Sequence, residues 1–283
     1  MSMPVTLRKM VPGDVSGAIL LSRAAGWNQT EKDWLFLINS PGHLSMVAEV
    51  HHDVVGTITA VLYEKELAWI GMVLVAKDNR GQGISKRLLA NVLDQLSHVK
   101  VIKLDATPQG QLVYKGFGFL ETNSIIRMTK DADRMYDLAS EDSSNIAGID
   151  TNMQPIVDLD YSVFGARRTQ LIEYLVGESP NRCWSFSDHS GFILGRAGDR
   201  YHHLGPMVAK DEADAKILIA KVLRDLNGKS VVVDVPEDKS TWLIWLTSIG
   251  FSPQRNFVRM SKNQTVFNGL VDKQYLIAGP EFG

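Results

Sequence analysis

The sequence predicts an α/β protein with mixed sheets, built from two domains of similar design. Runs of β-branched and other apolar residues alternate with stretches in which apolar residues recur at helical spacing. The length of 283 residues corresponds to two domains at about 150 residues each. Short segments of the first half also recur in the same order in the second half. This pattern favours two layered units in tandem.

The first half alternates strands and helices. The apolar positions between Leu88 and Leu96 keep helical spacing, which predicts an amphipathic helix over residues 84–96. Residues 69–75 are almost wholly apolar, as expected of a strand that is buried on both faces. The remaining expected elements are strands at 5–9, 99–104 and 125–129, a hairpin of 44–50 and 54–62, helices at 14–25 and 30–38, and a short helix around Tyr114.

An internal duplication is indicated by three landmarks. Val75–Ala76–Lys77–Asp78 recurs as Val208–Ala209–Lys210–Asp211, and each copy ends an apolar run and precedes a helical pattern. The strand that ends at Asp105 has an echo that ends at Asp234, and Gly118–Phe119 recurs as Gly250–Phe251. The offsets lie between 129 and 133 residues, which favours a duplication. We therefore expect domains at residues 1–130 and 144–283, joined by a polar linker at 131–143.

Composition excludes several classes of protein. The formal charge is −2, so no basic surplus indicates nucleic acid or an anionic membrane as the partner. Cys183 is the only cysteine, which excludes a disulfide within the chain, and seven scattered histidines offer no metal-ligand spacing. No signal peptide and no membrane-spanning apolar run are visible. We expect a cytoplasmic protein without a metal site.

The most informative segment is the loop Arg80–Gly81–Gln82–Gly83–Ile84–Ser85, which lies between the apolar strand and the amphipathic helix. The first amides of a helix have no intrahelical partner and carry partial positive charge. Glycines allow the backbone to approach an anion, and Arg80, Lys86 and Arg87 add positive charge. This pattern is typical of a pyrophosphate cradle. The alternative is a plain turn between a strand and a helix.

The loop closely resembles the [QR]-x-x-G-x-[GA] motif of the GNAT acetyltransferases, with Ser85 in the small-residue position. Tyr114, four residues before Gly118, fits a second family pattern, although Thr107 and Gly110 replace its usual asparagine and alanine. The resemblance covers roughly residues 5 to 130. The chain also resembles a group of bacterial tandem-GNAT proteins, in its segments 25–30 (AGWNQT), 104–110 (LDATPQG), 164–168 (FGARR) and 278–283 (AGPEFG).

The resemblance implies an acetyl-CoA-dependent N-acetyltransferase and assigns roles to residues. Tyr114 takes the place of the proton donor to the coenzyme A sulfur; its alternative role is that of an aromatic packed between helix and sheet. Trp27, Asn28 and Gln29 lie where the family shapes the acceptor pocket. The coenzyme contacts that the motifs imply are Val73, Leu74, Val75, Arg80, Gly81, Gln82, Gly83, Ile84, Ser85, Lys86, Thr107 and Tyr114.

Two carboxylates are candidates for the general base. In this family a carboxylate often removes the proton of the amine through a water molecule. Glu49 is on the strand at 44–50, and Asp105 ends the strand after the cradle helix. The alternatives are that Glu49 faces solvent and that Asp105 caps the following turn.

The second half lacks the cradle. After Lys210 come Asp211, Glu212 and Asp214 without a glycine, so carboxylates replace the phosphate-binding loop. We expect this half not to bind acetyl-CoA, and either to wall off the acceptor site or to support assembly as a monomer or homodimer. The expected activity is direct transfer of an acetyl group to an amine of a small molecule or a protein. The alternative is a non-catalytic regulator that binds acyl-CoA.

Overall fold

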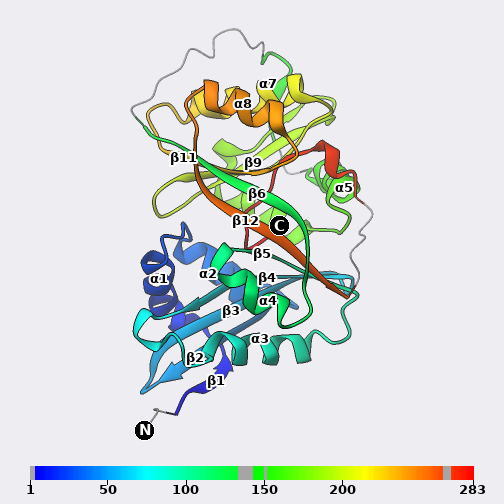
Figure 1. Ribbon diagram of the computed structural model, residues 1–283. Coiled ribbons are helices and arrows are strands. Elements are labelled where there is room, and N and C mark those ends of the chain that lie inside the picture. The colour runs from blue at the N-terminus through cyan, green and yellow to red at the C-terminus, as the bar shows by residue number, and fades with distance from the viewer. Residues whose placement is uncertain (1–3, 133–142, 150–151, 264–268) are drawn as a thin grey trace.

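The computed structural model describes residues 4–132, 143–149, 152–263 and 269–283. Its first half is an α/β unit in the lower part of Figure 1. The elements of this half are β1 (Thr6–Lys9), α1 (Val15–Ala24), α2 (Glu31–Asn39), β2 (Leu44–Val50), β3 (Asp53–Tyr63), β4 (Leu67–Val75), α3 (Ile84–Gln95), β5 (Val101–Ala106), α4 (Pro108–Lys115) and β6 (Leu120–Lys130).

The second half, in the upper part of Figure 1, repeats the parallel strand pair with its crossover helix. Its elements are β7 (Ile146–Gly148), α5 (Gln154–Phe164), α6 (Thr169–Glu178), β8 (Trp184–Phe186), β9 (Phe192–Ala197), β10 (His202–Val208), α7 (Glu212–Asp225), β11 (Val231–Pro236), α8 (Ser240–Ser248), β12 (Ser252–Asn263) and β13 (Gln274–Leu276). The expected fold class and the internal duplication are thus confirmed.

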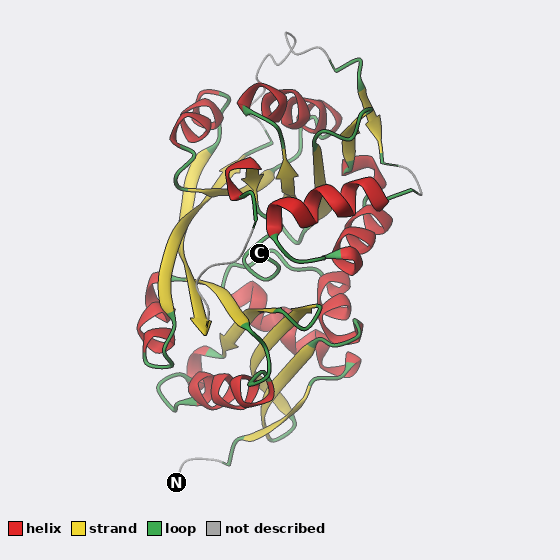
Figure 2. Ribbon diagram, turned by 90° about the vertical axis from the view of Figure 1, so that its right-hand side faces the viewer, coloured by secondary structure: helices red, strands yellow, loops and turns green. Residues whose placement is uncertain are grey.

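The two halves exchange their last long strands. β6 of the first half pairs antiparallel with β11 of the second, and β12 of the second pairs antiparallel with β5 of the first. β6 and β12 also pair with each other and cross the middle of the molecule side by side (Figures 1 and 2). One sheet therefore runs through both halves, in the order β1-β2-β3-β4-β5-β12-β6-β11-β10-β9-β8-β7.

Buried side chains also connect the halves. Trp69 of β4 lies in one hydrophobic cluster with Phe164 of α5, Phe192 of β9 and Phe282. The ring centroids of Trp69 and Phe164 are 6.0 Å apart. Residues from 274 to 283 are buried as well, so the end of the sequence contributes to this shared core. Neither half could keep its full core without the other.

Local sequence accounts for the helices that flank the site. Thr30 and Asp33 form a capping box at the start of α2, in which the Thr30 amide donates to the Asp33 carboxylate at 2.7 Å. α3 buries its apolar stripe against the sheet, as its spacing predicts. Asp14 stands at the N-cap of α1 but does not cap it, because its carboxylate binds Arg8 instead. The predicted linker falls largely on residues 133–142, which are outside the described residues, and the domain boundaries stay predictions.

Candidate active site

Strands β4 and β5 separate and open a gap in the sheet. Their parallel pairing extends only from Leu67 opposite Val101 to Ile70 opposite Leu104, although β4 continues to Val75. A bulge against β3 follows Gly71, and Met72 there has a φ of 52°. The Thr57 hydroxyl donates to the Met72 carbonyl at 2.7 Å and fixes this irregular backbone. The backbone of residues 71–75 is thereby turned toward a space that another molecule can enter.

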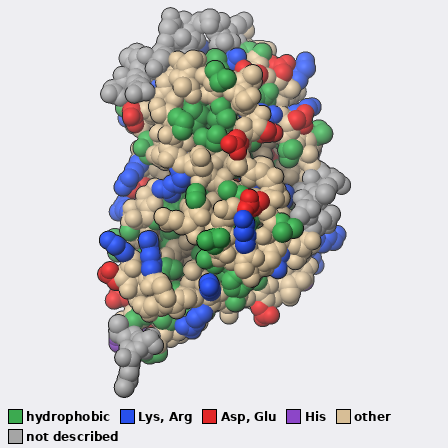
Figure 3. Space-filling view, in the orientation of Figure 1, with side chains coloured by type: hydrophobic (Ala, Val, Ile, Leu, Met, Phe, Trp, Pro, Cys, Tyr) green, Lys and Arg blue, Asp and Glu red, His purple; other side chains and the backbone are tan. Residues whose placement is uncertain are grey.

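The loop after β4 has the geometry of an anion cradle. Gly81 and Gly83 have φ values of 77° and 74°, and a Cβ at either position would meet no atom within 4 Å. Gly83 is the N-cap of α3 and provides no side-chain cap, so the first amides of α3 remain available to an anion. The Arg80 side chain bonds the Val75 carbonyl at 3.2 Å. Lys and Arg side chains gather on the lower half of the face shown in Figure 3.

A cleft of about 640 Å³ runs from this cradle along the open edge of β4. Seven of the predicted coenzyme contacts line it: Val73, Leu74, Val75, Arg80, Ser85, Thr107 and Tyr114. The other five, Gly81, Gln82, Gly83, Ile84 and Lys86, form the loop and the start of α3 but are not among the described lining residues. Ile84, the first residue of α3, is buried in the hydrophobic cluster between the helix and the sheet, so it anchors the start of the helix. The residues present therefore fit an elongated ligand with phosphates at one end.

A narrower pocket of about 50 Å³ continues from the cleft and shares Trp27, Val73, Thr107 and Tyr114 with it. Gly71 is needed here, because a Cβ at this position would lie 2.8 Å from the Glu281 Cα. The other residues that line the pocket are Ile70, Met72, Leu104, Asp105, Pro280 and Glu281.

Tyr114 lies where the cleft meets the pocket. Its ring packs edge-on against Phe119, with centroids 6.0 Å apart. Burial raises the pKa of Tyr114 above its ordinary value, so the hydroxyl remains protonated and can act as a proton donor. The neighbouring Thr107 caps α4, since its hydroxyl accepts a hydrogen bond from the Gly110 amide. The N-cap residue of α4 therefore forms part of the wall of the cleft.

The two predicted base candidates are placed very differently. Asp105 lines the pocket, and both its oxygens accept hydrogen bonds from Arg259 of β12, at 2.8 and 2.9 Å. Burial raises the pKa of Asp105, and the Arg259 charge opposes this shift. Glu49 binds Arg8 at the edge of the sheet and is not among the described residues that line the cleft or the pocket.

Of the predicted acceptor contacts, the structure brings only Trp27 to the described walls of the cleft and the pocket. Asn28 is bound to the backbone of Arg200 and Tyr201, so it fastens the loop before α2 to the second half. Gln29 donates to the Glu281 carboxylate at 3.0 Å. Asn28 and Gln29 thus hold the loop before α2 in position through contacts with the second half.

Sequence reasoning expected the second half either to wall off the acceptor site or to support assembly, but it did not identify which residues of this half reach the site. Pro280, Glu281 and Arg255 line the pocket or the cleft, and Arg259 holds Asp105. The signal for Pro280 and Glu281 was the resemblance of residues 278–283 to the ending of the tandem-GNAT group. The sequence contained no signal for Arg255 or Arg259. The Glu281 carboxylate is buried and is also bound by Arg196.

In the second half, the chain itself occupies the corresponding gap. β13 pairs with β10, and the Ile277 amide donates to the Asp234 carbonyl of β11 at 3.0 Å. The start of α7 is also closed, because the Asp211 carboxylate accepts from the Asp214 amide at 3.0 Å. Leu246 is buried at the position that corresponds to Tyr114. A coenzyme would have to displace β13 in order to bind here as it would in the first half.

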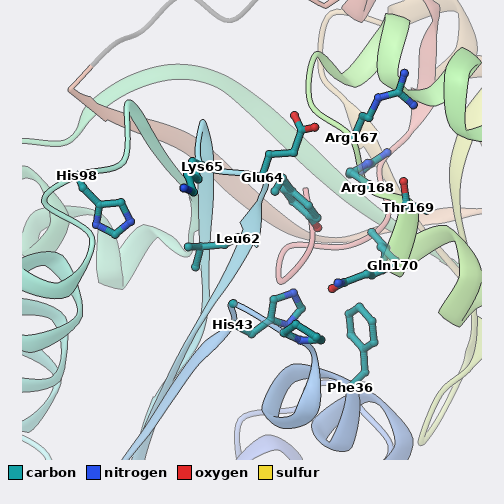
Figure 4. Close-up of a pocket in the computed structure, with 14 residues that line it drawn as sticks. Phe36, His43, Leu62, Glu64, Lys65, His98, Arg167, Arg168, Thr169 and Gln170 are labelled. Atoms are coloured by element: carbon teal, nitrogen blue, oxygen red, sulfur yellow. The ribbon is translucent and has the colours of Figure 1, made fainter.

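A separate pocket of about 510 Å³ lies at the junction of the halves (Figure 4). It is lined by the α2–β2 loop, the β3–β4 turn and the start of α6, and Gln170 points toward His43 across it. Burial lowers the pKa of His43 to about 4. None of the predicted site residues is among its described lining residues.

Family models match both halves of the chain. Residues 29–129 match one acetyltransferase (GNAT) domain, and residues 156–276 match another, so the two matches together cover well over half of the sequence. The chain is a tandem GNAT protein. Among its described residues, no cluster of metal-ligating side chains is found and no helix is long and apolar enough to cross a bilayer.

Curated relatives of this tandem GNAT protein match most of its length. The uncharacterized N-acetyltransferase YitH of Bacillus subtilis is 23% identical over 87% of both chains. The holothin acyltransferase of a Pseudoalteromonas species is 26% identical over 83% of this chain and 79% of the relative.

Solved structures share the tandem fold. A candidate acetyltransferase from Pyrococcus horikoshii superposes with a TM-score of 0.84 at 20% identity, over 100% of this chain and 97% of the other. A tandem GNAT protein from the clavulanic acid biosynthesis pathway has a TM-score of 0.65 at 15% identity, over 93% of this chain and 100% of the other. These similarities establish the fold.

Proposed function

We propose that the first half is an acetyl-CoA-dependent N-acetyltransferase that transfers the acetyl group directly to a primary amine. The single observation that carries this proposal is the continuous path from the uncapped start of α3, along the open edge of β4, to Tyr114 and the narrow pocket. Phosphates fit the cradle, and the pantetheine arm fits the gap where β4 has no pairing with β5. The acetyl thioester would then meet the acceptor between Tyr114 and Trp27.

Direct transfer makes three chemical demands. The amine must be neutral when it attacks the thioester carbonyl, the carbonyl oxygen must be stabilised, and the sulfur must receive a proton as the carbon–sulfur bond breaks. Amides of the bulged β4 backbone near Val73 supply donors that are fixed before the reaction. The protonated Tyr114 hydroxyl gives its proton to the departing thiolate.

We assign the removal of the amine proton to Asp105, acting through water. Of the two predicted carboxylates, it is the one that lines the pocket among the described residues. Its oxygens are held by Arg259, which fixes the carboxylate in place. Burial raises the pKa of Asp105, and a higher pKa makes the carboxylate a stronger base.

The small volume of the narrow pocket, about 50 Å³, favours a small or slender amine as the acceptor. We propose that a single coenzyme binds per chain, because β13 occupies the corresponding gap of the second half. The holothin acyltransferase among the relatives carries a name that fits acyl transfer.

Titration of acetyl-CoA by calorimetry tests the proposal. We expect one site per chain, followed by acetyl transfer when a panel of amines is added to the complex. Two sites per chain would contradict the role given to β13, and no binding would overturn the enzyme assignment. Binding without transfer to any amine would favour the non-catalytic regulator.

A further inference from the structure

The buried arginines that the structure describes at the junction of the two halves are all paired with carboxylates, whereas the half-buried Arg255 is not. Arg127 binds Asp234, Arg168 binds Asp160, Arg196 binds Asp33 and Glu281, and Arg259 binds Asp105. Arg255 has no carboxylate partner among the described residues, and its hydrogen bond to a protein acceptor is a long one, 3.4 Å to the Ala25 carbonyl. A half-buried guanidinium without a counter-ion is costly unless a ligand supplies the charge.

The position of Arg255 connects this missing charge with the active site. The exchanged strand β12 brings it to the wall of the 640 Å³ cleft, next to Trp27. Its guanidinium carbon lies 5.3 Å from the centroid of the Trp27 ring, which also lines the narrow pocket. Burial and the charge of Arg127 lower the pKa of Arg255, and the charge of Asp234, which Arg127 already binds, raises it by less.

Arg80 lines the same cleft, but its guanidinium has different surroundings from the guanidinium of Arg255. Arg80 stands at the cradle, where the phosphates of a coenzyme would bind. Arg255, on β12, lies beside Trp27 and the end of α1, and the loop that carries Trp27 borders the narrow pocket. The carboxylates of that pocket, Asp105 and Glu281, already have arginine partners. Among the described residues that line the cleft and the pocket, the positive charge without a carboxylate partner at this end is therefore that of Arg255.

We infer that Arg255 recognises a carboxylate on the acceptor, so that the substrate is a small amine that also carries a carboxylate, with its apolar part against Trp27. This inference rests on the proposed function and specifies its acceptor class. A guanidinium binds a carboxylate through two parallel hydrogen bonds, which orients the acceptor as well as attracting it. The second half then contributes directly to substrate selection through an exchanged strand.

The first test separates the acceptor from the coenzyme, because both carry negative charge. Acetyl-CoA is titrated against the unaltered protein, Arg255→Gln and Arg80→Gln. We expect Arg255→Gln to bind acetyl-CoA like the unaltered protein, and Arg80→Gln to bind it about tenfold more weakly. A similar loss in both variants would assign Arg255 to the coenzyme and overturn the inference. Absence of binding to the unaltered protein would instead refute the proposed function.

The second test uses benzoate and benzamide, which share a shape but differ in charge, on the protein saturated with coenzyme A. We expect benzoate to bind about tenfold more tightly than benzamide, Arg255→Gln to lose this preference, and Arg255→Lys to retain part of it. Equal binding of the two probes to the unaltered protein, or an unchanged preference in Arg255→Gln, would overturn the inference. Thermal unfolding of both variants checks that the fold is intact.

Discussion

Arg259 of β12 holds both carboxylate oxygens of Asp105 on β5, although 154 positions separate the two residues in the sequence. The pair joins the halves at the wall of the narrow pocket, and Arg259 also lies over the ring of Trp69, 4.6 Å from its centroid. It therefore connects the exchange of strands with the geometry of the site. We therefore expect a change at this pair to affect stability and, through Asp105, the proposed catalysis.

Replacing Arg259 with Met should destabilise the protein strongly. The side chain of Asp105 is fully buried, and loss of its cation leaves an uncompensated charge, which costs about 3–5 kcal/mol in comparable pairs. The measurement is the free energy of unfolding in urea. The double variant Asp105→Asn with Arg259→Met should recover part of the loss, because neither charge then remains. If the single variant is as stable as the unaltered protein, the pair does not hold the halves together.

Substitution of Gly83 by Ala tests the cradle. A left-handed φ of 74° costs an alanine about 1–2 kcal/mol, and its methyl group would point into open space where the phosphates should lie. We expect acetyl-CoA binding to weaken by about tenfold or more. Gly228→Ala is the matched control, because Gly228 has a φ of 70° and equally open surroundings in the second half. It should lose similar stability and no affinity; equal affinities in the two variants would exclude the cradle.

Local patterns in the sequence were enough to predict the loop at residues 80–85 and the helices near it. The apolar stripe of α3 and the Thr30–Asp33 box depend on residues a few positions apart, so the spacing alone predicts them. The polar start of β6 was missed because the prediction followed only its apolar residues 125–129. That start pairs with β12, as in Ser261 opposite Leu120.

The exchange of strands could not be predicted from the same patterns. The sequence pattern predicted part of β6 as a strand and no strand at the position of β12, and β5 could pair with either strand without any change of its own sequence. Contacts such as Gln29 with Glu281, 252 positions apart, leave no local signal. For this reason the second half's residues at the site were missed. Asn28 and Gln29 were interpreted as acceptor contacts because the family resemblance places them where the acceptor pocket is shaped.

The Tyr114→Phe variant tests acid catalysis. The hydroxyl is kept protonated by burial, and a positioned proton donor contributes about 10²–10⁴-fold to a rate. We expect kcat for acetyl transfer to fall by at least about 10²-fold, while the affinity for acetyl-CoA stays unchanged. Tyr161→Phe is the control, because Tyr161 is exposed on α5 and is not among the lining residues of the cleft. An unchanged kcat in Tyr114→Phe would leave the tyrosine a packing role only.

His43 should make stability depend on pH. Burial lowers its folded-state pKa to about 4, below the ordinary value near 6.5, so between these values the unfolded chain binds a proton that the folded protein does not. Stability therefore falls as pH falls from about 6.5 to about 4, by at most about 3 kcal/mol from this residue. His43→Gln should reduce the slope of unfolding free energy against pH in this window. An unchanged slope in His43→Gln would refute the assignment.

The two halves should unfold in one transition. β5 has β12 of the other half as its neighbour, and β11 has β6, so unfolding either half removes a strand from the sheet of the other. The shared cluster around Trp69 and Phe282 would be opened at the same time. We expect calorimetry to show a single peak, with tryptophan fluorescence and far-ultraviolet circular dichroism changing at the same temperature. A fragment of residues 1–130 provides the complementary test, because it lacks β12 and the buried residues 277–283. It should fail to give a cooperative transition of its own, and a native-like fragment, or two separate peaks in the whole chain, would show that the halves are independent.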